Sequence, residues 1–414
     1  MSASWLDGFR DPALAQVQIA RLEQLAAELA GLPETADSAG PAESTEMTGL
    51  SETAQSAEST KLEPAAQVSA APRPLRLMEV CGTHTVAIAR AGLRSILPAN
   101  LQLISGPGCP VCVTANADID RIIALTRIPN LTVLSFGDMI RVPGSSTSLQ
   151  QRKAEGAAVE VVYSPLDALR LAAEQPERQF VFVGVGFETT TPLIAACIER
   201  ARAQNLHNFS VLAAHKQVPS ALAALACDPQ VQLDALILPG HVSTILGLAP
   251  YAFVAARYNI PGVVTGFEPI DLLQGLLALL EQLLAMRRDG ASAHIGNAYR
   301  RAVMDEGNPT ARSAIERVFM PADAVWRGLG TIADSGYRLR PEFADFDASC
   351  RFELDVEPTV EPRGCQCGEV LRGILPPNRC RLFGRACTPQ NPIGPCMVSS
   401  EGSCAAYYRY QVED

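Results

Sequence analysis

The chain has 414 residues, of which 48% are hydrophobic and 19% are charged, and it carries a formal net charge of −10. Its length allows two or three globular domains, and its negative charge argues against nucleic acid or an anionic membrane as the main partner. No apolar run reaches the ~18 residues of a membrane span. Because the first ten residues also lack the apolar core of an export signal, we expect a cytoplasmic protein.

The N-terminal part combines one amphipathic helix with a segment that lacks a core-forming pattern. Leucine and isoleucine recur at helical spacing over residues 11–32, which predicts that residues 1–32 provide a helix that packs on another domain. Residues 33–73 are rich in Ala, Ser, Thr, Glu and Pro and contain almost no large apolar side chain. Such a composition buries too little apolar surface to offset the entropy of ordering, so we expect a disordered insertion there.

Short apolar strands alternate with helical stretches over residues 74–286. Near-continuous apolar runs of this kind are typical of parallel strands that are covered on both faces. The predicted strands are residues 75–80, 101–105, 132–136 and 159–163, followed by residues 179–185, 209–214, 235–238 and 262–265. We therefore predict an α/β fold with two similar Rossmann-like units, residues 74–165 and residues 166–286. Ligands of such sheets bind at the carboxyl ends of the strands.

The remaining segment, residues 287–414, is less regular and is predicted to form a separate C-terminal domain. Its sequence favours helices at residues 291–303 and 311–319 and an extended stretch at residues 343–357. Its last fifty residues contain six cysteines among many Gly and Pro residues, namely Cys365, Cys367, Cys380, Cys387, Cys396 and Cys404. Because this stretch has little periodicity from which to build a core, we expect thiolates bound to an iron–sulfur cluster or a metal to stabilise it.

Six thiols are more than one cluster needs. Four thiolates complete a [4Fe–4S] cluster, and a surplus pair beside it could exchange electrons with it as dithiol and disulfide. Zinc is the alternative metal. The spacing of the cysteines does not by itself choose four ligands among the six.

The first predicted strand runs directly into the loop Cys81-Gly82-Thr83-His84-Thr85. A thiolate and a neutral imidazole are ligands for soft or borderline metals. A helix begins in this loop, and we expect the dipole at its N-terminus to lower the pKa of Cys81. The pattern is short, and the alternative is that these two side chains are ordinary members of the core.

A second loop, residues 106–112, contains the C-x-x-C motif of Cys109 and Cys112. Such a pair can hold one edge of a metal site or cycle between dithiol and disulfide. No second C-x-x-C is present to complete a Cys₄ zinc site, so we favour redox chemistry or partial metal ligation. Two buried thiols without a chemical role are the alternative.

Polar residues also follow the strands of the second predicted unit. Residues 186–192 read Gly-Phe-Glu-Thr-Thr-Thr-Pro and include Glu188, and residues 239–243 read Pro-Gly-His-Val-Ser and include His241. These side chains could bind a partner or orient a small ligand. Glu188 and the threonines fit the start of a helix equally well. No glycine-rich phosphate loop of the known kinds occurs, so nucleotide use is not supported.

Taken together, the segments at residues 78–85, 106–112, 186–192, 239–247 and 365–410 resemble the HypD family of [NiFe]-hydrogenase maturation proteins. The order of the motifs is far more specific than any one of them, and the resemblance covers residues 75–410 and the first helix. The insertion after that helix departs from the family pattern but leaves the motifs intact.

The resemblance implies a scaffold on which an iron atom receives one carbonyl and two cyanide ligands. Its implied partners are a HypC-type chaperone and a HypE-type cyanide donor. It further implies that Cys81 holds the iron, with Cys109 and Cys112 as a redox-active or iron-associated pair nearby. The remaining candidates, which would orient the site or contact a partner, are His84, Glu188 and His241.

The cysteine-rich end also resembles the cluster region of ferredoxin:thioredoxin reductase. That resemblance implies that the [4Fe–4S] ligands are Cys365, Cys380, Cys387 and Cys404, and that the redox pair is Cys367 and Cys396. We expect an assembly scaffold with redox activity rather than a turnover enzyme. A [4Fe–4S]-dependent dithiol/disulfide oxidoreductase is the alternative, and a zinc-stabilised binding module is a third possibility.

Overall fold

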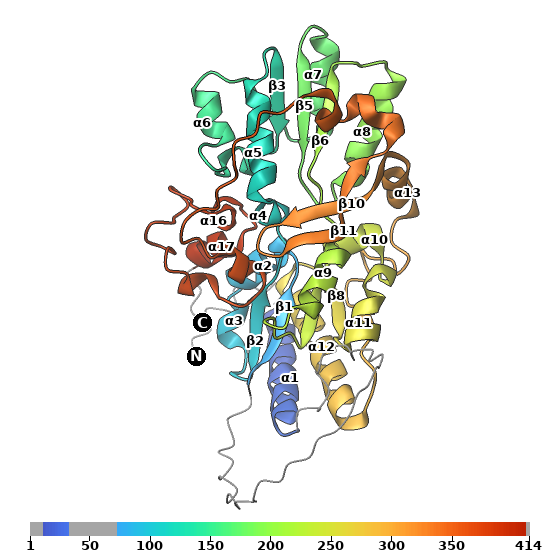
Figure 1. The fold of residues 1–414 in the computed structure, drawn as a ribbon. Helices are drawn as coiled ribbons and strands as arrows, with labels where there is room; N and C mark the ends of the chain where they lie inside the picture. Colours follow the sequence, from blue (N-terminus) through green and yellow to red (C-terminus); the bar gives the residue numbers. More distant parts are fainter. Residues whose placement is uncertain (1–10, 33–72, 411–414) are drawn as a thin grey trace, which may run out of the picture.

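The computed structural model describes residues 11–32 and 73–410, so the predicted insertion lies outside the described residues apart from its last position. The described chain forms two parallel sheets, an antiparallel hairpin and an irregular C-terminal region (Figure 1). The α/β class and the parallel sheets predicted from the sequence are therefore confirmed. The helices that have at least seven residues are α1 (Pro12–Ala30), α2 (Gly82–Arg90), α5 (Asn116–Ala124), α7 (Pro165–Glu174), α8 (Thr191–Ala203), α9 (Val218–Cys227), α10 (Gly240–Leu246), α11 (Ala252–Tyr258), α12 (Pro269–Asp289), α13 (Pro309–Val318) and α17 (Ser403–Tyr410). The shorter helices are α3 (Leu93–Ile96), α4 (Pro110–Val113), α6 (Leu149–Ala154), α14 (Ala348–Arg351), α15 (Cys367–Leu371) and α16 (Pro395–Val398).

The first sheet has the strand order β2-β1-β7-β8-β9, and all of its pairs are parallel. Its strands are β1 (Leu75–Glu79), β2 (Leu101–Ser105), β7 (Ala235–Pro239), β8 (Gly262–Thr265) and β9 (Ile295–Asn297). Side chains alternate between its two faces, as expected for strands. Leu77 packs with α1 and α12 on one face. Met78 packs on the other face with α9, α11 and the cysteine-rich region.

The second sheet has the order β4-β3-β5-β6 and is also parallel throughout. Its strands are β3 (Leu131–Ser135), β4 (Val159–Val161), β5 (Gln179–Gly184) and β6 (Phe209–Ala213). One face carries Phe180 and Phe182 against α7, α8 and α13. The opposite face carries Val181 and Val183 against α5 and the short helices near it.

The strands divide between the sheets differently from the two consecutive units expected from the sequence. β3 and β4 belong to the first expected unit but pair with β5 and β6, whereas β7 and β8 join β1 and β2. The chain thus crosses from one sheet to the other after β2 and returns after β6. Apolar runs identify parallel strands, but they carry no information about which strands pair, so the sequence could not place these crossovers.

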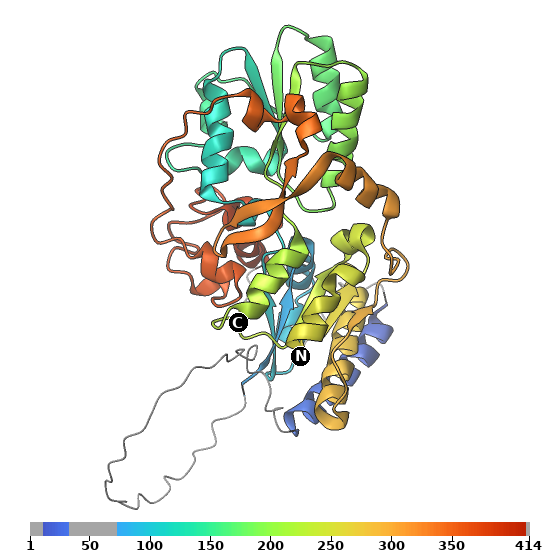
Figure 2. The same ribbon diagram turned by 45° about the vertical axis from the view of Figure 1, so that its right-hand side comes forward.

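The N-terminal helix α1 packs along α12 beside the first sheet (Figure 2). Its buried side chains include Leu22, Leu25 and Leu29, and Asp11 caps its first turn by accepting a hydrogen bond from the backbone N–H of Leu14. α12 is the one described helix long and apolar enough to cross a membrane, but more than half of its most apolar window is buried inside the protein. This burial is that of a core helix, which passes the same test of length and composition.

A hairpin that the sequence analysis did not predict links the two sheets. Its strands are β10 (Phe319–Trp326) and β11 (Gly330–Leu339). Trp326 bridges to Thr114 in the segment that follows β2, and Gly336 bridges to Lys216 just after β6. Figure 1 shows the hairpin lying between the sheets. Loops from both sheets therefore meet at this hairpin.

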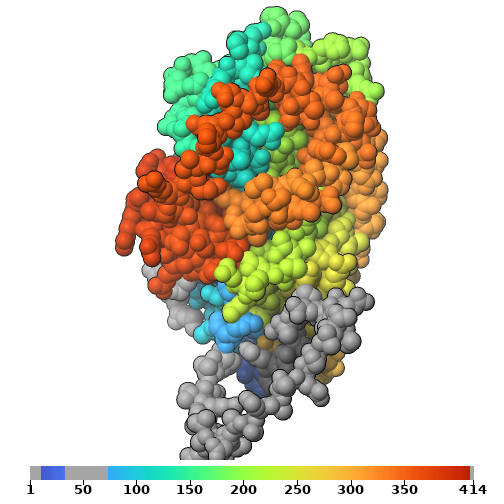
Figure 3. All heavy atoms as spheres, in the orientation of Figure 1, coloured from blue at the N-terminus to red at the C-terminus, as the bar shows by residue number. Residues whose placement is uncertain are grey.

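Two details of the predicted C-terminal region were wrong. The helix expected at residues 291–303 is the short strand β9 within an irregular segment, and the extended stretch expected at residues 343–357 begins with a 3₁₀ turn and α14. The helix expected at residues 311–319 is present as α13. The cysteine-rich segment forms one side of the molecular surface beside both sheets (Figure 3).

Candidate functional site

Cys81 lies at the end of β1, where the chain turns into α2. Its loop touches the C-x-x-C loop that follows the neighbouring strand β2, because the N–H of Gly82 donates to the carbonyl of Gly108 at 2.8 Å. A Cβ atom on Gly108 would lie 2.1 Å from the backbone nitrogen of Cys81, so only glycine fits there. The strand pairing thus places two loops predicted as separate motifs in direct contact.

The thiol of Cys81 is buried, and this burial determines its protonation. Burial raises the pKa of Cys81 to about 11, and backbone N–H groups of His84 and Thr83 at the start of α2 oppose that shift only in part. The expected lowering of this pKa was therefore wrong, because desolvation outweighs the helix terminus. Without a metal, Cys81 is a neutral thiol at neutral pH, and binding a metal would release its proton.

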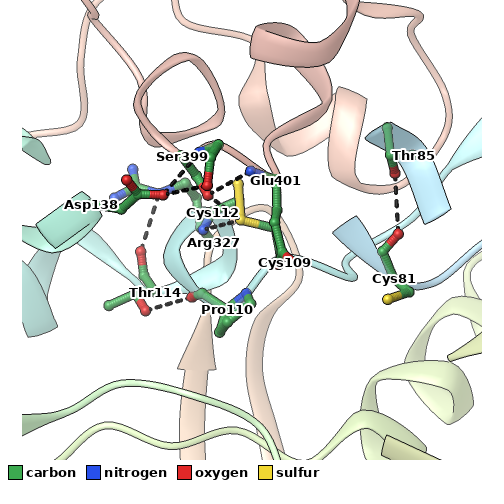
Figure 4. The surroundings of a disulfide bond; sticks show 11 residues. Cys81, Thr85, Cys109, Pro110, Cys112, Thr114, Asp138, Arg327, Ser399 and Glu401 are labelled. Atoms are coloured by element: carbon green, nitrogen blue, oxygen red, sulfur yellow. Dashed lines mark hydrogen bonds between the residues drawn. A yellow bond between two sulfur atoms is a disulfide. The ribbon is translucent and has the colours of Figure 1, made fainter. Parts of the chain in front are cut away.

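Cys109 and Cys112 form a disulfide (Figure 4). Cys109 is also the N-cap of α4, and its Sγ accepts a hydrogen bond from the backbone N–H of Cys112 at 3.2 Å. Ser399, from the C-terminal region, places its Oγ 3.3 Å from the same sulfur atom. Both cysteines are buried, so large molecules have no direct access to the disulfide.

His84 and His241 both contact the ring of Phe267, with centroid distances of 4.7 and 3.9 Å. Nε2 of His84 lies 3.0–3.2 Å from the carbonyl oxygens of Thr265 and Gly266, so this nitrogen carries the proton. Burial lowers the pKa of His84 to about 4. Its Nδ1 has no hydrogen-bond partner among the described residues, which leaves a neutral acceptor within the buried site.

Glu188 is buried and has the raised pKa of a desolvated carboxyl group. Its Oε1 accepts a hydrogen bond from the N–H of Val218 at 3.0 Å, at the start of α9. Burial raises the pKa of Glu188 to about 8. The residue therefore supports the helix-start interpretation, although for α9 rather than for α8, which directly follows it in the sequence.

Glu401 is a site residue that the sequence analysis missed. Its carboxylate accepts a hydrogen bond from the hydroxyl of Thr83 at 2.6 Å. A Cβ atom on Gly82 would lie 2.6 Å from the side chain of Glu401, so the C-terminal region is in contact with the Cys81 loop. Only its position three residues before Cys404 pointed to it, because the contact joins residues 318 positions apart.

The cysteines of the C-terminal region converge on one small cavity. Its sulfur-bearing wall consists of Cys365, Cys367, Cys380, Cys387 and Cys404. The sulfur atoms of Cys365 and Cys367 are 3.3 Å apart, and their hydrogen bond lowers the pKa of Cys365 to about 7 while raising that of Cys367. Cys396 is fully buried beside this wall. The hydrogen bond with Cys367 lowers the pKa of Cys396, but the hydrogen bond with Cys404 and burial raise it more, so that it lies well above the ordinary value of a thiol.

The donor set at this cavity fits an iron–sulfur cluster. Thiols are the ligands such clusters use, and Gly394 leaves open the space next to two of them. A Cβ atom on Gly394 would lie 2.6 Å from Sγ of Cys365 and 2.7 Å from Sγ of Cys367. Within residues 11–32 and 73–410, no three His, Cys, Asp or Glu side chains already stand in the arrangement of a metal site.

The disulfide lies in the same buried cluster of side chains as Cys367, Cys387, Cys396 and Cys404. α4 with its disulfide contacts α15, which begins at Cys367, and α16, which carries Cys396. Two of the three predicted thiol centres, the disulfide and the C-terminal cysteines, are therefore joined by packing. Cys81 reaches the disulfide loop through Gly82 and Gly108, and that loop reaches the C-terminal cysteines through helix contacts.

Comparison with known proteins identifies close relatives over most of the chain. The HypD family model, described as the hydrogenase formation hypA family, matches residues 57–411. Hydrogenase maturation factor HypD from Azotobacter vinelandii is 47% identical over 345 residues, which cover 82% of this chain and 90% of the relative. Hydrogenase maturation factor HypD from Escherichia coli K12 is 46% identical over 345 residues, with 83% and 91% covered. The hydrogenase expression/formation protein HupD from Azotobacter chroococcum is 47% identical, with 82% and 90% covered.

Proposed function

The chain belongs to the HypD family of hydrogenase maturation factors, and on that premise we propose that it is the scaffold on which iron receives two cyanide ligands and one carbonyl. The observation that carries this proposal is the contact between the Cys81 loop and the loop of the Cys109–Cys112 disulfide. A metal-binding thiol beside a redox-active pair suits a cargo that must be held by thiolate and kept as Fe(II). We place this activity in the cytoplasm.

In this proposal Cys81 binds the iron cargo, and a HypC-type chaperone supplies a further ligand. His84 and Glu401 would support the site, His84 as a neutral imidazole and Glu401 as the acceptor of the hydrogen bond from Thr83. His241 is exposed and stacks on Phe267 at 3.9 Å, which suits contact with a partner such as the chaperone or a HypE-type cyanide donor. Glu188 would act from a distance, by fixing the start of α9.

We further propose that Cys365, Cys380, Cys387 and Cys404 hold a [4Fe–4S] cluster. A bound cluster supplies storage for single electrons close to the buried thiols. All four cysteines line the same cavity. This choice leaves Cys367 and Cys396 as the dithiol pair, and each is buried beside the other.

The dithiol pair can reduce the Cys109–Cys112 disulfide by exchange. Cys367 and Cys396 would lose two protons and two electrons and form a disulfide, while Cys109 and Cys112 would gain both and become thiols. The contacts of α4 with α15 and α16 place the two cysteine pairs on neighbouring elements, as such an exchange requires. The reduced pair would then protect the thiolate-bound iron from oxidation.

The alternative is a turnover oxidoreductase that acts on protein disulfides. It is less favoured because both cysteine pairs are buried, so a protein substrate would have to displace packed elements to reach them. Catalytic reduction of a disulfide substrate in the absence of the chaperone would support this alternative. Reduction that occurs only once for each protein molecule would support the scaffold.

Substitution of the iron-binding thiol tests the proposal. We expect Cys81→Ala to fold and to retain its cluster but to lose the infrared bands of iron-bound cyanide and carbonyl after co-purification with the chaperone. Cys227→Ala, which changes an exposed cysteine outside the site, should keep these bands. Bands of unchanged intensity in Cys81→Ala would remove Cys81 from the iron site.

A further inference from the structure

Exposed arginines lie close in the sequence to the cysteines that line the cavity. Residues 363–410 contain six arginines and two glutamates, a net charge of +4, although the whole chain carries −10. Five of these arginines are exposed, and we call them the arginine patch: Arg363, Arg379, Arg381, Arg385 and Arg409. The sixth, Arg372, lies nearer the core and binds Asp228 at 3.0 Å. Positive charge is thus concentrated on one small part of an acidic protein.

The patch arginines have no visible structural task. Within residues 11–32 and 73–410, none of their guanidinium groups makes an ion pair or a hydrogen bond. The neighbouring buried Arg327, by contrast, pairs with Glu361 at 2.9 Å and bonds to the carbonyl of Thr114. Unpaired exposed charges contribute little to stability, so their concentration at this place calls for a partner outside the chain.

Local contacts bring the patch together around an apolar centre. Arg379 and Arg381 flank Cys380 directly in the sequence. A Cβ atom on Gly364, next to Arg363, would lie 3.7 Å from Leu382. Phe383 and Tyr408 contact each other edge to face at 6.1 Å, which brings the end of α17 and its Arg409 to the same place. Tyr408 is 38% exposed, so the centre of the patch is apolar and accessible.

We propose that the arginine patch is the docking surface of an acidic protein that carries single electrons. The inference rests on the redox role proposed above for the cysteine region. An apolar centre with a charged rim is the usual composition of a protein interface, and contacts of electron carriers are small and steered by charge. Cys365 and Cys380 are only partly buried, so a carrier docked on the patch lies next to the cavity that they line.

A protein suits this surface better than a nucleic acid or a membrane. The patch is compact and has aromatic side chains at its centre, and the acidic remainder of the chain repels extended polyanions. The electron balance is also simple. Two reduced carriers each lose one electron, and these two electrons with two protons from water convert one Cys367–Cys396 disulfide into two thiols.

Charge reversal of the patch tests the inference on the full chain purified without oxygen. The variant R379E/R381E/R385E is compared with R257E/R300E/R338E, which makes the same change in charge at three other exposed arginines. The probe is an acidic [2Fe–2S] ferredoxin, used oxidised to measure binding and reduced to measure the rate of electron transfer. Photoreduced deazariboflavin serves as an uncharged donor that needs no docking surface.

We expect the patch variant to bind ferredoxin more weakly and to oxidise it about tenfold more slowly or worse at low ionic strength, while the control variant stays close to wild type. With deazariboflavin, all three proteins should be reduced at the same rate. Equal ferredoxin rates and affinities in the two variants would overturn the inference. So would an equal loss with both donors, because the arginines would then support the thiol site itself.

Two further outcomes separate the possible explanations. If phosphatidylserine vesicles or duplex DNA bind through the patch while ferredoxin binding is unaffected by its reversal, the docking partner is not an acidic protein and the inference fails. If the wild-type protein accepts no electrons from deazariboflavin, the proposed redox function fails. In that case the affinities of the two variants for oxidised ferredoxin are the measurement that tests the docking surface.

Discussion

At the scale of single residues, burial controls the chemistry of the site more than local sequence does. Cys81, His84 and Glu188 are all buried, and desolvation is the largest cause of the shift in the pKa of each. All three are therefore neutral at neutral pH when no metal is bound. Neutral groups are less costly to bury than charged ones, and Cys81 would become charged only if a bound metal displaced its proton.

Glu188 makes the stability of the protein depend on pH. Its pKa is about 8 in the folded state against an ordinary value of 4.5, so between these values the folded state keeps a proton that the unfolded state has released. The free energy of unfolding should therefore fall as pH rises through this window, by about 1.4 kcal/mol per pH unit from this group. Glu188→Gln keeps an oxygen for the N–H of Val218 but does not titrate. We expect the stability of this variant relative to wild type to increase from pH 4.5 to 8 in urea unfolding.

A matched substitution shows whether this slope comes from burial. Glu177→Gln changes an exposed glutamate, and the difference between that variant and wild type should be the same throughout the window. If the difference between Glu188→Gln and wild type is equally constant, the carboxyl group of Glu188 is ionised in the folded protein and its assignment as a buried neutral group is wrong.

At the scale of elements, the sequence predicted the helices and strands that have a local pattern, and it missed the hairpin whose position depends on packing between distant residues. Strands β1 to β8, α1 and α13 have clear local patterns and were predicted close to their observed bounds, whereas β9 falls in a segment that was expected to be helical. The hairpin β10–β11 was missed because its strands alternate only weakly and hold small residues such as Ala322 and Ala324. Its place is fixed by Trp326, which bridges to Thr114 and stacks on the ring of Phe187, contacts with distant residues that no local pattern reveals.

Helix α1 should contribute substantially to stability through its packing on α12. Leu25 is fully buried in that interface, whereas Val17 on the same helix is 67% exposed. Leu25→Ala should lower the free energy of unfolding by about 2–5 kcal/mol, from lost burial and the cavity that remains. Val17→Ala should change it by less than about 0.5 kcal/mol. Urea unfolding followed by circular dichroism measures both, and similar values for the two variants would mean that α1 is not anchored to the first sheet in solution.

At the scale of the whole molecule, the site is assembled from parts that are far apart in the sequence. The sequence pointed to each cysteine motif, since thiols are recognisable wherever they stand. It could not show that the loops after β1 and β2 touch, that the chain changes sheets twice, or that Glu401 reaches the Cys81 loop. Those relations follow from strand pairing and from the C-terminal region folding back beside the first sheet.

The joined thiol centres predict that electrons reach the Cys109–Cys112 disulfide only through the C-terminal cysteines. Because the disulfide is buried, we expect direct attack by a reductant in solution to be slow. In wild-type protein that carries the proposed cluster, photoreduced deazariboflavin should therefore convert this disulfide into two thiols, which differential alkylation and mass spectrometry detect. Cys396→Ser removes one thiol of the proposed donor pair and should leave the disulfide oxidised, although iron and sulfide contents stay unchanged.

The exposed Cys350 provides the control. Cys350→Ser should behave as wild type, because this residue lies outside the buried cluster that contains Cys396 and the disulfide. Reduction of the disulfide in Cys396→Ser at the wild-type rate would show that the electrons take another route. The contact between α4 and α16 would then be structural, and the C-terminal region would stabilise the iron site without supplying its reducing power.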